Sequence, residues 1–248
     1  MTPSFDLGGR VALVTGANTG LGQAIAVGLA AAGADIVAVG RSAPTETGEA
    51  VTALGRRFTA VSADLGSTAP IPAIVEQAGP VDILVNNAGI IRRNDSLDFS
   101  EDDWDAVMDT NLKSAFFLSQ AVARTWVAAG RGGKIINICS MLSFQGGIRV
   151  PSYTASKSGL AGLTRLLACE WAGKGINVNG IAPGYFATNN TEALRADETR
   201  NRDILARIPA GRWGDPGDLA GAAVFLASDA AAYVHGTVLP VDGGWLAR

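Results

Sequence analysis

The chain has 248 residues, of which 48% are hydrophobic and 17% are charged, and its formal net charge at pH 7 is −3. A chain of this length and hydrophobicity can bury one large core. With so little charge and no basic block, we expect neither nucleic acid nor an anionic membrane as a partner. No apolar run approaches the ~20 residues of a membrane helix, and Met1 to Arg10 contain no signal-peptide core. We therefore expect a cytoplasmic protein whose partner is a small molecule.

The cysteine and histidine content argues against a metal site. Cys139 and Cys169 each lie in an apolar stretch, where a reduced core residue is expected rather than a disulfide partner. The single histidine, His235, is too little for a multi-histidine metal site and is expected to pack in a turn. We therefore expect no metal in this protein.

The first chemical motif is a glycine-rich loop between a strand and a helix. The apolar run 11–14 predicts a strand buried on both faces of a parallel sheet, and the periodicity of Leu21, Ile25 and Leu29 predicts a helix that ends near Gly33. Glycines in between permit a tight turn and a close approach of the backbone to a pyrophosphate. Glycine clusters also form ordinary turns, but this setting favours dinucleotide binding. The loop residues expected to bind the cofactor are Gly16, Asn18, Thr19, Gly20, Leu21 and Gly22.

The residues after the second strand bear on the choice between NAD(H) and NADP(H). A strand is predicted at 35–39, and Gly40, Arg41 and Ser42 follow it. This position faces the adenosine ribose in dinucleotide-binding folds, where an acidic residue would bind the ribose hydroxyls. Arg41 can instead pair with a 2′-phosphate, and Ser42 can donate to it, which favours NADP(H). The alternative is an exposed arginine that stacks on adenine and accepts both cofactors.

Two further predicted strands end at the same edge of the sheet. Strand 58–63 is followed by Asp64, whose carboxylate could accept from the adenine amino group or cap the next helix. Strand 81–85 is followed by Asn86, which could brace the structure or contact a ribose, and then by small residues that fit against a cofactor. The cofactor contacts expected here are Asp64, Leu65, Asn87, Ala88 and Gly89.

Asn111 is unusual because it falls within a predicted helix. That helix is expected to begin at Ser100, with Asp103 three residues later as part of its cap. An amide in the middle of a helix competes with the backbone hydrogen bonds, so Asn111 predicts a kink or a bound water that serves a proton relay. Exposure to solvent is the alternative.

The segment from Ser140 to Lys157 is the candidate reaction centre. A strand predicted at 134–138 leads to Ser140, which places this hydroxyl where open α/β sheets bind ligands. Tyr153 and Lys157 are four residues apart, so on a helix their side chains share one face. An ammonium beside a phenol lowers the phenol pKa from about 10 toward the range useful in acid–base chemistry. The alternative is an ordinary helix pair with a snorkelling lysine.

The whole chain predicts a single α/β domain over residues 1–248. Alternating strands and helices, with last strands at 178–181 and 238–241, indicate a doubly wound parallel sheet of about seven strands with helices on both faces. The polar segment at about 185–212 is predicted to form a mobile substrate flap. Cofactor contacts at and before this segment are expected from Pro183, Gly184 and Thr188.

Together these motifs resemble the short-chain dehydrogenase/reductase family, and the resemblance extends from Gly9 to Arg248. The motifs that carry it are Thr15-Gly16-x-x-x-Gly20-x-Gly22, Asn86-Asn87-Ala88-Gly89, Asn111, Ser140, Tyr153-x-x-x-Lys157 and Pro183-Gly184. The resemblance implies a Rossmann-type fold, an NAD(P) cofactor, and hydride transfer between nicotinamide and a secondary alcohol or ketone. It also implies a catalytic tetrad of Asn111, Ser140, Tyr153 and Lys157, in which Tyr153 and Lys157 also contact the cofactor.

Within that family, four substrate-side stretches resemble the 2-dehydro-3-deoxy-D-gluconate 5-dehydrogenases and the gluconate 5-dehydrogenases. These stretches are 90–93, 140–151, 185–191 and 208–214. The resemblance implies a sugar-acid substrate, whose carboxylate needs a cation, and Arg149, Arg92 and Arg93 are the nearest candidates. The residues expected to contact the substrate are Arg93, Ser140, Gln145, Arg149 and Tyr153.

Two other functions are alternatives at this point. Reduction of a 3-oxoacyl thioester or a general ketone uses the same chemical core, and an NAD(P)-sensing or scaffolding protein would bind the cofactor without turnover. The complete tetrad argues against the second alternative. Small residues on the Tyr153 helix and the apolar residues 116–118 suggest a contact between subunits, and the family resemblance implies a homotetramer.

Overall fold

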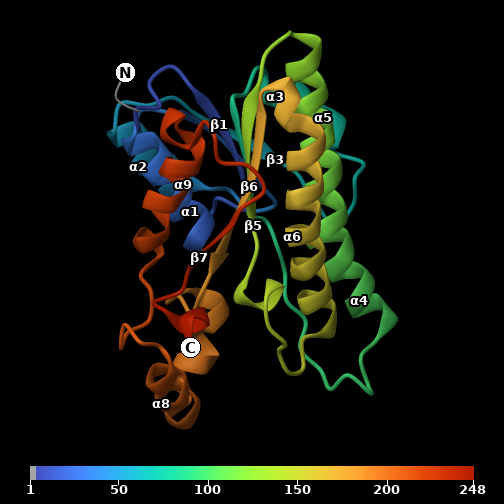
Figure 1. Cartoon of the computed structure of the whole chain (residues 1–248), viewed down its shortest axis with the longest axis vertical. Coiled ribbons are helices and arrows are strands. Elements are labelled where there is room, and N and C mark those ends of the chain that lie inside the picture. The colour runs from blue at the N-terminus through green and yellow to red at the C-terminus, as the bar shows by residue number, and fades with distance from the viewer. Residues whose placement is uncertain (1–3) are drawn as a thin grey trace.

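A seven-stranded sheet forms the centre of the molecule (Figure 1). The computed structural model describes residues 4–248, and of Asn190 it describes the backbone alone. The strands are β1 (Val11–Thr15), β2 (Asp35–Gly40), β3 (Phe58–Ser62), β4 (Ile83–Asn86), β5 (Gly133–Ile138), β6 (Ile176–Pro183) and β7 (Val238–Val241). Their order is β3-β2-β1-β4-β5-β6-β7, and all neighbouring pairs are parallel. The direction of winding reverses between β1 and β4, which creates the crevice where such sheets bind ligands.

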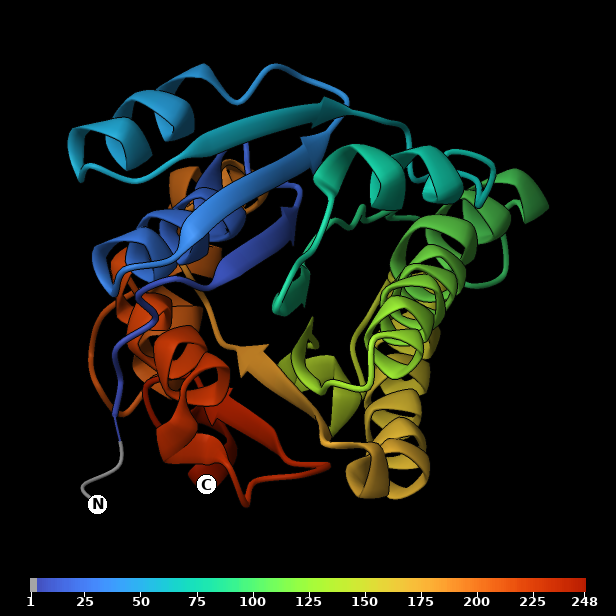
Figure 2. The same ribbon diagram turned by 90° about the horizontal axis from the view of Figure 1, so that it is seen from above.

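Helices cover both faces of the sheet (Figure 2). They are α1 (Gly20–Ala31), α2 (Thr45–Ala53), α3 (Ile71–Ala78), α4 (Glu101–Met108), α5 (Ser114–Ala128), α6 (Pro151–Trp171), α7 (Glu192–Ala196), α8 (Glu198–Arg207) and α9 (Ala220–Ala227). Buried side chains of α1 and α9 pack on one face, and those of α3, α5 and α6 pack on the other. The doubly wound parallel fold predicted from the sequence is therefore confirmed.

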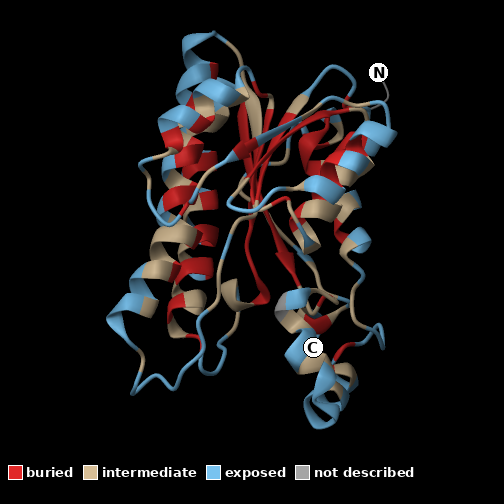
Figure 3. Cartoon of the chain, turned by 180° about the vertical axis from the view of Figure 1, so that it is seen from behind, coloured by how far each residue is buried: buried red, intermediate tan, exposed pale blue. Residues whose placement is uncertain are grey.

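Alternate residues of a strand pack against the helices on opposite faces of the sheet, because successive side chains of a strand point to opposite faces. In β1, Ala12 and Val14 pack with α1 and α9, whereas Leu13 packs with α3 and α5. Both faces are buried (Figure 3). This double burial explains why the central strands are continuous apolar runs without polar alternation.

The segment that follows β6 contains more regular structure than a flap of loops. Residues 185–212 include the short helices α7 and α8, and Asp197 caps α8 by accepting from the backbone N–H groups of Thr199 and Arg200. Ile204 and Ile208 are buried in a small cluster with Trp245, near the end of the chain. The mobility of this segment stays a prediction.

Two sequence expectations outside the site have different outcomes. Cys139 is buried as expected, but the core position expected for Cys169 is wrong, because it is exposed. Leu167 and Ala168 take the inward positions of α6, so the helical period turns Cys169 toward the surface. Within residues 4–248 we find no helix with the length and apolar character needed to cross a bilayer.

Candidate active site

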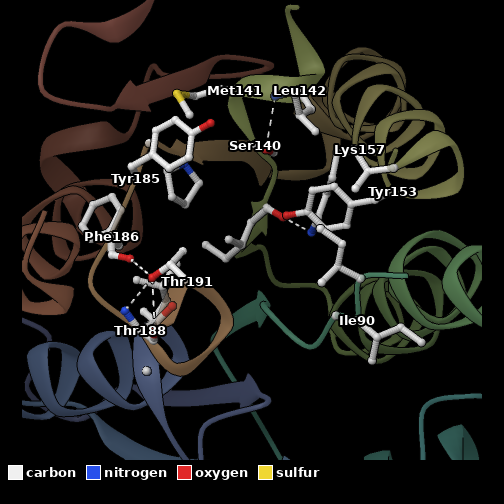
Figure 4. A pocket seen from close by; sticks show the side chains of 18 of the residues that line it. Ile90, Ser140, Met141, Leu142, Tyr153, Lys157, Tyr185, Phe186, Thr188 and Thr191 are labelled. Atoms are coloured by element: carbon white, nitrogen blue, oxygen red, sulfur yellow. Dashed lines mark hydrogen bonds between the residues drawn. The ribbon is translucent and has the colours of Figure 1, made fainter. Parts of the chain in front are cut away.

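A cavity of about 490 Å³ opens where β1, β4, β5 and β6 end (Figure 4). Most of the residues predicted for the site line this cavity, namely Gly16, Asn18, Thr19, Gly20, Leu21, Gly22, Asn87, Ala88, Gly89, Arg93, Ser140, Gln145, Tyr153, Lys157, Pro183, Gly184 and Thr188. The predicted residues outside its lining are Arg41, Ser42, Asp64, Leu65, Asn111 and Arg149. The fold thus brings the glycine loop and the Ser140 to Lys157 segment to one cavity.

The glycine loop fits a pyrophosphate. Gly16 and Gly20 adopt positive φ angles of 66° and 60°, which side chains other than glycine rarely tolerate. A Cβ on Gly16 would lie 3.0 Å from the Cα of Ala88, and a Cβ on Gly22 would collide with the Gly16 carbonyl oxygen. Thr19, the N-cap of α1, forms no side-chain cap hydrogen bond, so the first N–H groups of α1 are free to bind phosphate oxygens.

The loop is held in place from behind by Asn87 and Thr15. The Asn87 amide donates to the carbonyl oxygens of Thr15 (2.9 Å) and Gly16 (3.1 Å). The Thr15 hydroxyl accepts from the backbone N–H groups of Asn87 (3.0 Å) and Ala88 (2.9 Å). Asn86 is buried and donates to Ser119 and Asn137, so bracing is the role that the structure shows for it. These hydrogen bonds fix the β1 and β4 ends against each other.

The candidates for the adenosine end of the cofactor lie on neighbouring strand ends. Arg41 and Ser42 are exposed and directly follow β2, and Gly40 of β2 is in register with Ser62 of β3. Asp64 accepts from the backbone N–H of Gly66 at 2.9 Å and is also exposed. Leu65 is buried, and its carbonyl oxygen accepts from the Ser114 hydroxyl. Arg41, Ser42 and Asp64 are therefore accessible to a ligand, whereas the Leu65 side chain belongs to the core.

Ser140, Tyr153 and Lys157 converge on the cavity from β5 and α6. Ser140 follows β5, and its hydroxyl accepts from the backbone N–H of Leu142 at 3.1 Å, which fixes the turn. Tyr153 lies in the first turn of α6 and Lys157 in the next turn, so both side chains share one face, as predicted. The Lys157 ammonium lies 5.6 Å from the centroid of the Tyr153 ring and donates to the Ile138 carbonyl oxygen at 2.6 Å. Figure 4 shows this group on one wall of the cavity.

Burial dominates the ionisation of the tyrosine and the lysine. Removal from water raises the pKa of the Tyr153 phenol, and the Ser140 hydroxyl and then the Arg93 charge act in the opposite direction. Burial also lowers the pKa of the Lys157 ammonium to about 8. The expected lowering of the Tyr153 pKa is wrong for this arrangement, because desolvation outweighs the charges around the phenol. Tyr153 is therefore a protonated acid at neutral pH.

Asn111 lies at the junction of α4 and α5, where the helix widens into a π-helical turn over residues 109–113. The predicted kink is confirmed, and the solvent-exposed alternative is wrong, because Asn111 is buried. The side-chain amide of Asn111 donates a hydrogen bond to the Ser156 hydroxyl of α6 at 3.3 Å. Ser100 accepts from the Asp103 N–H at 3.2 Å, so the predicted cap of α4 is confirmed as well.

The candidate substrate cations are distributed unequally around the cavity. Arg93 lines it and lies close enough to Tyr153 to influence its pKa. Arg92 forms an ion pair with Asp103 at 3.0 Å and is outside the lining. Arg149 is exposed, has a positive φ of 63°, and contributes its carbonyl oxygen to a hydrogen bond with the Asn94 N–H. Of the three arginines, the structure brings only Arg93 to the cavity.

Several residues of the cavity region were not predicted individually from the sequence, and three of them bear on the substrate side. Arg200 lines the cavity from α8, and Tyr185 lines it from the segment after β6. Trp245 is buried behind the cavity and donates from Nε1 to the Gln145 side-chain oxygen at 3.1 Å. Gln145 and Trp245 are 100 residues apart, so no local pattern could have paired them. The abundance of arginine in 195–212 was the only signal for Arg200.

Comparison with known proteins agrees with this geometry. The family model for short chain dehydrogenases matches residues 10–199. The chain is 65% identical to the 2-dehydro-3-deoxy-D-gluconate 5-dehydrogenase of Escherichia coli, over 99% of this chain and 98% of that protein. A solved structure from Agrobacterium tumefaciens that contains NADP is 65% identical, with a TM-score of 0.95 over 100% of both chains. A gluconate 5-dehydrogenase from Burkholderia cenocepacia, in complex with NADP and tartrate, is 42% identical, with a TM-score of 0.92 over 98% of both chains. The chain belongs to the short-chain dehydrogenase family.

Proposed function

We propose that this protein is an NADP-dependent oxidoreductase that interconverts a secondary alcohol and a ketone at carbon 5 of a six-carbon sugar acid. The observation that carries the proposal is the convergence of Ser140, Tyr153 and Lys157 on one cavity with the glycine loop. The names of two relatives, 2-dehydro-3-deoxy-D-gluconate 5-dehydrogenase and gluconate 5-dehydrogenase, support a sugar acid as the substrate. We take 2-dehydro-3-deoxy-D-gluconate as the leading substrate and D-gluconate as the second.

The cofactor would extend from the end of β2 to Tyr153. When bound, the nicotinamide supplies or accepts the hydride. The glycine loop would hold the pyrophosphate, Lys157 the nicotinamide ribose, and Arg41 and Ser42 a 2′-phosphate. Both Arg41 and Ser42 are exposed and close to the ribose position of this fold, which supports a preference for NADP(H). Pro183, Gly184 and Thr188 would close the nicotinamide end of the site.

Tyr153 would exchange the proton of the reacting oxygen. In the direction of reduction, the Tyr153 hydroxyl donates its proton to the substrate oxygen as that oxygen gains negative charge. Its raised pKa keeps this proton in place at neutral pH. Ser140 would donate a hydrogen bond to the same oxygen and thereby orient it. The Lys157 ammonium, one helical turn from Tyr153, would stabilise the phenolate that forms when the proton leaves.

We also propose that the protein assembles as a homotetramer in the cytoplasm. An apolar groove runs between α5 and α6, and Phe117, Val127 and Leu166 expose large apolar surfaces beside it. Apolar patches of this kind commonly mark contacts between proteins. Equilibrium sedimentation of the purified protein would test the tetramer.

One assay separates this function from its alternatives. The purified protein is incubated with 2-dehydro-3-deoxy-D-gluconate, D-gluconate, 5-keto-D-gluconate, simple ketones and a 3-oxoacyl thioester, each with NAD(H) and NADP(H), and nicotinamide absorbance is followed. We expect the highest kcat/KM for a sugar acid with NADP(H). Faster reduction of the thioester would favour the fatty-acid type of reductase. Tight cofactor binding without turnover of any substrate would favour a sensing role.

A further inference from the structure

Helix α8 packs against an aromatic cluster that consists of Tyr185, Trp213 and Trp245. The Tyr185 ring lies between the two tryptophans, with centroid distances of 5.5 Å to Trp213 and 4.8 Å to Trp245. Tyr185 comes from the segment after β6, and Trp245 comes from the turn after β7. The cluster therefore joins the segment after β6 to the turn after β7.

Two contacts fasten α8 to this cluster. The Trp213 Nε1 donates to the Asn201 side-chain oxygen at 2.7 Å. The Arg207 guanidinium lies 4.0 Å from the Trp245 ring centroid, within the range of a cation–π interaction. Ile204, between these two positions, is buried in the same cluster. These contacts define which face of α8 is turned inward.

Arg200 lies on the same face of α8, at its exposed end. It precedes Ile204 by four residues and Arg207 by seven, which is the spacing of one helix face. Arg200 lines the cavity near Tyr185: burial raises the pKa of the Tyr185 phenol, and the Arg200 charge acts against this rise. The Asp197 carboxylate accepts from backbone N–H groups at the start of α8. Within residues 4–248, Arg200 forms no ion pair with a carboxylate, so its charge is available at the cavity wall.

The position of Arg200 suits the far end of a sugar acid. The substrate proposed above reacts at carbon 5 and carries its carboxylate at carbon 1, at the other end of the carbon chain. A cation for this carboxylate must therefore lie away from Tyr153. Arg93 is on the Tyr153 side, as its influence on that phenol shows. Arg200 lies beside Tyr185, and Figure 4 shows Tyr185 across the cavity from Tyr153.

We propose that Arg200 binds the substrate carboxylate and so determines the specificity of the enzyme for sugar acids over neutral sugars. This inference rests on the proposed function. The planar guanidinium can form two parallel hydrogen bonds with a carboxylate, a geometry that a lysine cannot reproduce. Because Trp213 and Trp245 hold α8 through Asn201 and Arg207, the backbone of Arg200 is positioned at the cavity before the substrate binds, which reduces the loss of backbone freedom on binding.

The test compares each acid with its neutral counterpart. Wild type, Arg200→Gln, Arg200→Lys and Arg202→Gln are assayed with 2-dehydro-3-deoxy-D-gluconate, D-gluconate and the primary amides of both acids. Arg202 is the matched control, because it lies on the same helix, is mostly exposed and pairs with Asp203. For Arg200→Gln we expect kcat/KM for the acid, relative to the amide, to fall roughly ten- to hundredfold. The loss should appear in KM for the acid, with kcat and KM for NADP(H) nearly unchanged.

The remaining variants and outcomes separate the possible failures. Arg200→Lys should recover part of the preference for the acid, and Arg202→Gln should retain all of it. Suppose that the wild type is active on either acid. If Arg200→Gln then has the same ratio of kcat/KM for the acid to kcat/KM for the amide, the role of Arg200 is overturned and the proposed function stands. A wild-type enzyme inactive on both acids would remove the proposed function and this inference together.

Discussion

The side chain of Asn111 forms two hydrogen bonds with the backbone of Ile90. Its amide nitrogen donates to the Ile90 carbonyl oxygen at 2.9 Å, and its oxygen accepts from the Ile90 N–H at 2.8 Å. Asn111 lies in the π-helical turn, and Ile90 directly follows Asn87, Ala88 and Gly89. The pair therefore fixes the loop after β4 against the helix that crosses beside it.

Loss of this pair should destabilise the protein. Asn111→Ala removes both hydrogen bonds and leaves the polar backbone groups of Ile90 without a partner, so the free energy of unfolding should fall by about 2–4 kcal/mol. Urea denaturation followed by circular dichroism measures this change. Asn94→Ala is the control, because Asn94 is an exposed amide on the same loop and should alter stability by less than about 0.5 kcal/mol. Equal stability of the two variants would show that the Ile90 contact contributes little.

Tyr153→Phe should eliminate turnover and retain cofactor binding. The variant keeps the aromatic ring and loses only the hydroxyl that exchanges the proton, so kcat should fall at least a hundredfold. Titration of NADPH fluorescence should give a Kd within about threefold of wild type, since the hydroxyl contributes at most one hydrogen bond to the cofactor. Tyr233→Phe, at a fully exposed tyrosine, should have wild-type kinetics. Near-normal turnover by Tyr153→Phe would be incompatible with the assigned role.

Lys157→Met should abolish activity and increase stability at neutral pH. The pKa of Lys157 is about 8 in the folded protein, compared with an ordinary value of 10.5. Between these two values the unfolded chain binds a proton that the folded chain does not, so this residue makes the free energy of unfolding rise with pH over that window. Below pH 8 the buried ammonium costs about 3 kcal/mol, part of which the variant should recover.

The measurement is the difference in unfolding free energy between Lys157→Met and wild type from pH 7 to pH 10. This difference should be largest at pH 7 and should shrink as the pH rises, because the wild type then loses its buried charge. Lys113→Met serves as the control, because Lys113 is half exposed and pairs with Asp109 on the surface. A difference that is independent of pH would exclude the shifted ammonium as its cause.

Arg41 should set the preference for NADP(H). Arg41→Ser removes the charge that would pair with a 2′-phosphate, so kcat/KM with NADP(H) should fall roughly ten- to hundredfold while the value with NAD(H) changes little. Steady-state kinetics with both cofactors decide the point. Arg10→Ser is the control, because Arg10 directly precedes β1 and so lies at the amino-terminal ends of the strands, away from the cofactor site. If both cofactors lose activity equally, Arg41 stacks on adenine rather than reading the phosphate.

Trp245→Phe should weaken substrate binding with little effect on the chemical step. Phenylalanine retains an aromatic ring next to Tyr185 but has no N–H for the Gln145 oxygen, so the Gln145 side chain loses one of its anchors. We expect KM for the sugar acid to rise roughly two- to tenfold, the range of a single hydrogen bond, with KM for NADP(H) unchanged. Trp104→Phe, on the exposed side of α4, provides the comparison. Equal KM values in both variants would mean that Gln145 needs no such anchor.

The sheet and the reaction centre could be predicted because their signals are local. The run 11–14 is apolar at every position, since β1 is covered on both faces, and the glycine loop follows it directly. Tyr153 and Lys157 share a helix face through spacing alone. The kink at Asn111 followed from the conflict between an amide side chain and helical hydrogen bonds.

The parts that could not be predicted depend on distant segments. The raised pKa of Tyr153 depends chiefly on its burial, which the sequence does not specify. The approach of Trp245 to Gln145 depends on how the chain returns after β7. The approach of Arg200 to the cavity depends on the contacts of Trp213 and Trp245 with α8, which join segments distant in the sequence.

The two walls of the cavity come from parts of the chain that are synthesised at different times. The glycine loop, between Gly16 and Gly22, precedes Trp245 by more than 200 residues and is therefore synthesised first. Because Trp245 contacts both Gln145 and Arg207 of α8, this wall of the cavity cannot form before Trp245 has been synthesised. A nascent chain therefore contains the residues of the glycine loop well before it contains the tryptophan that completes the opposite wall of the cavity.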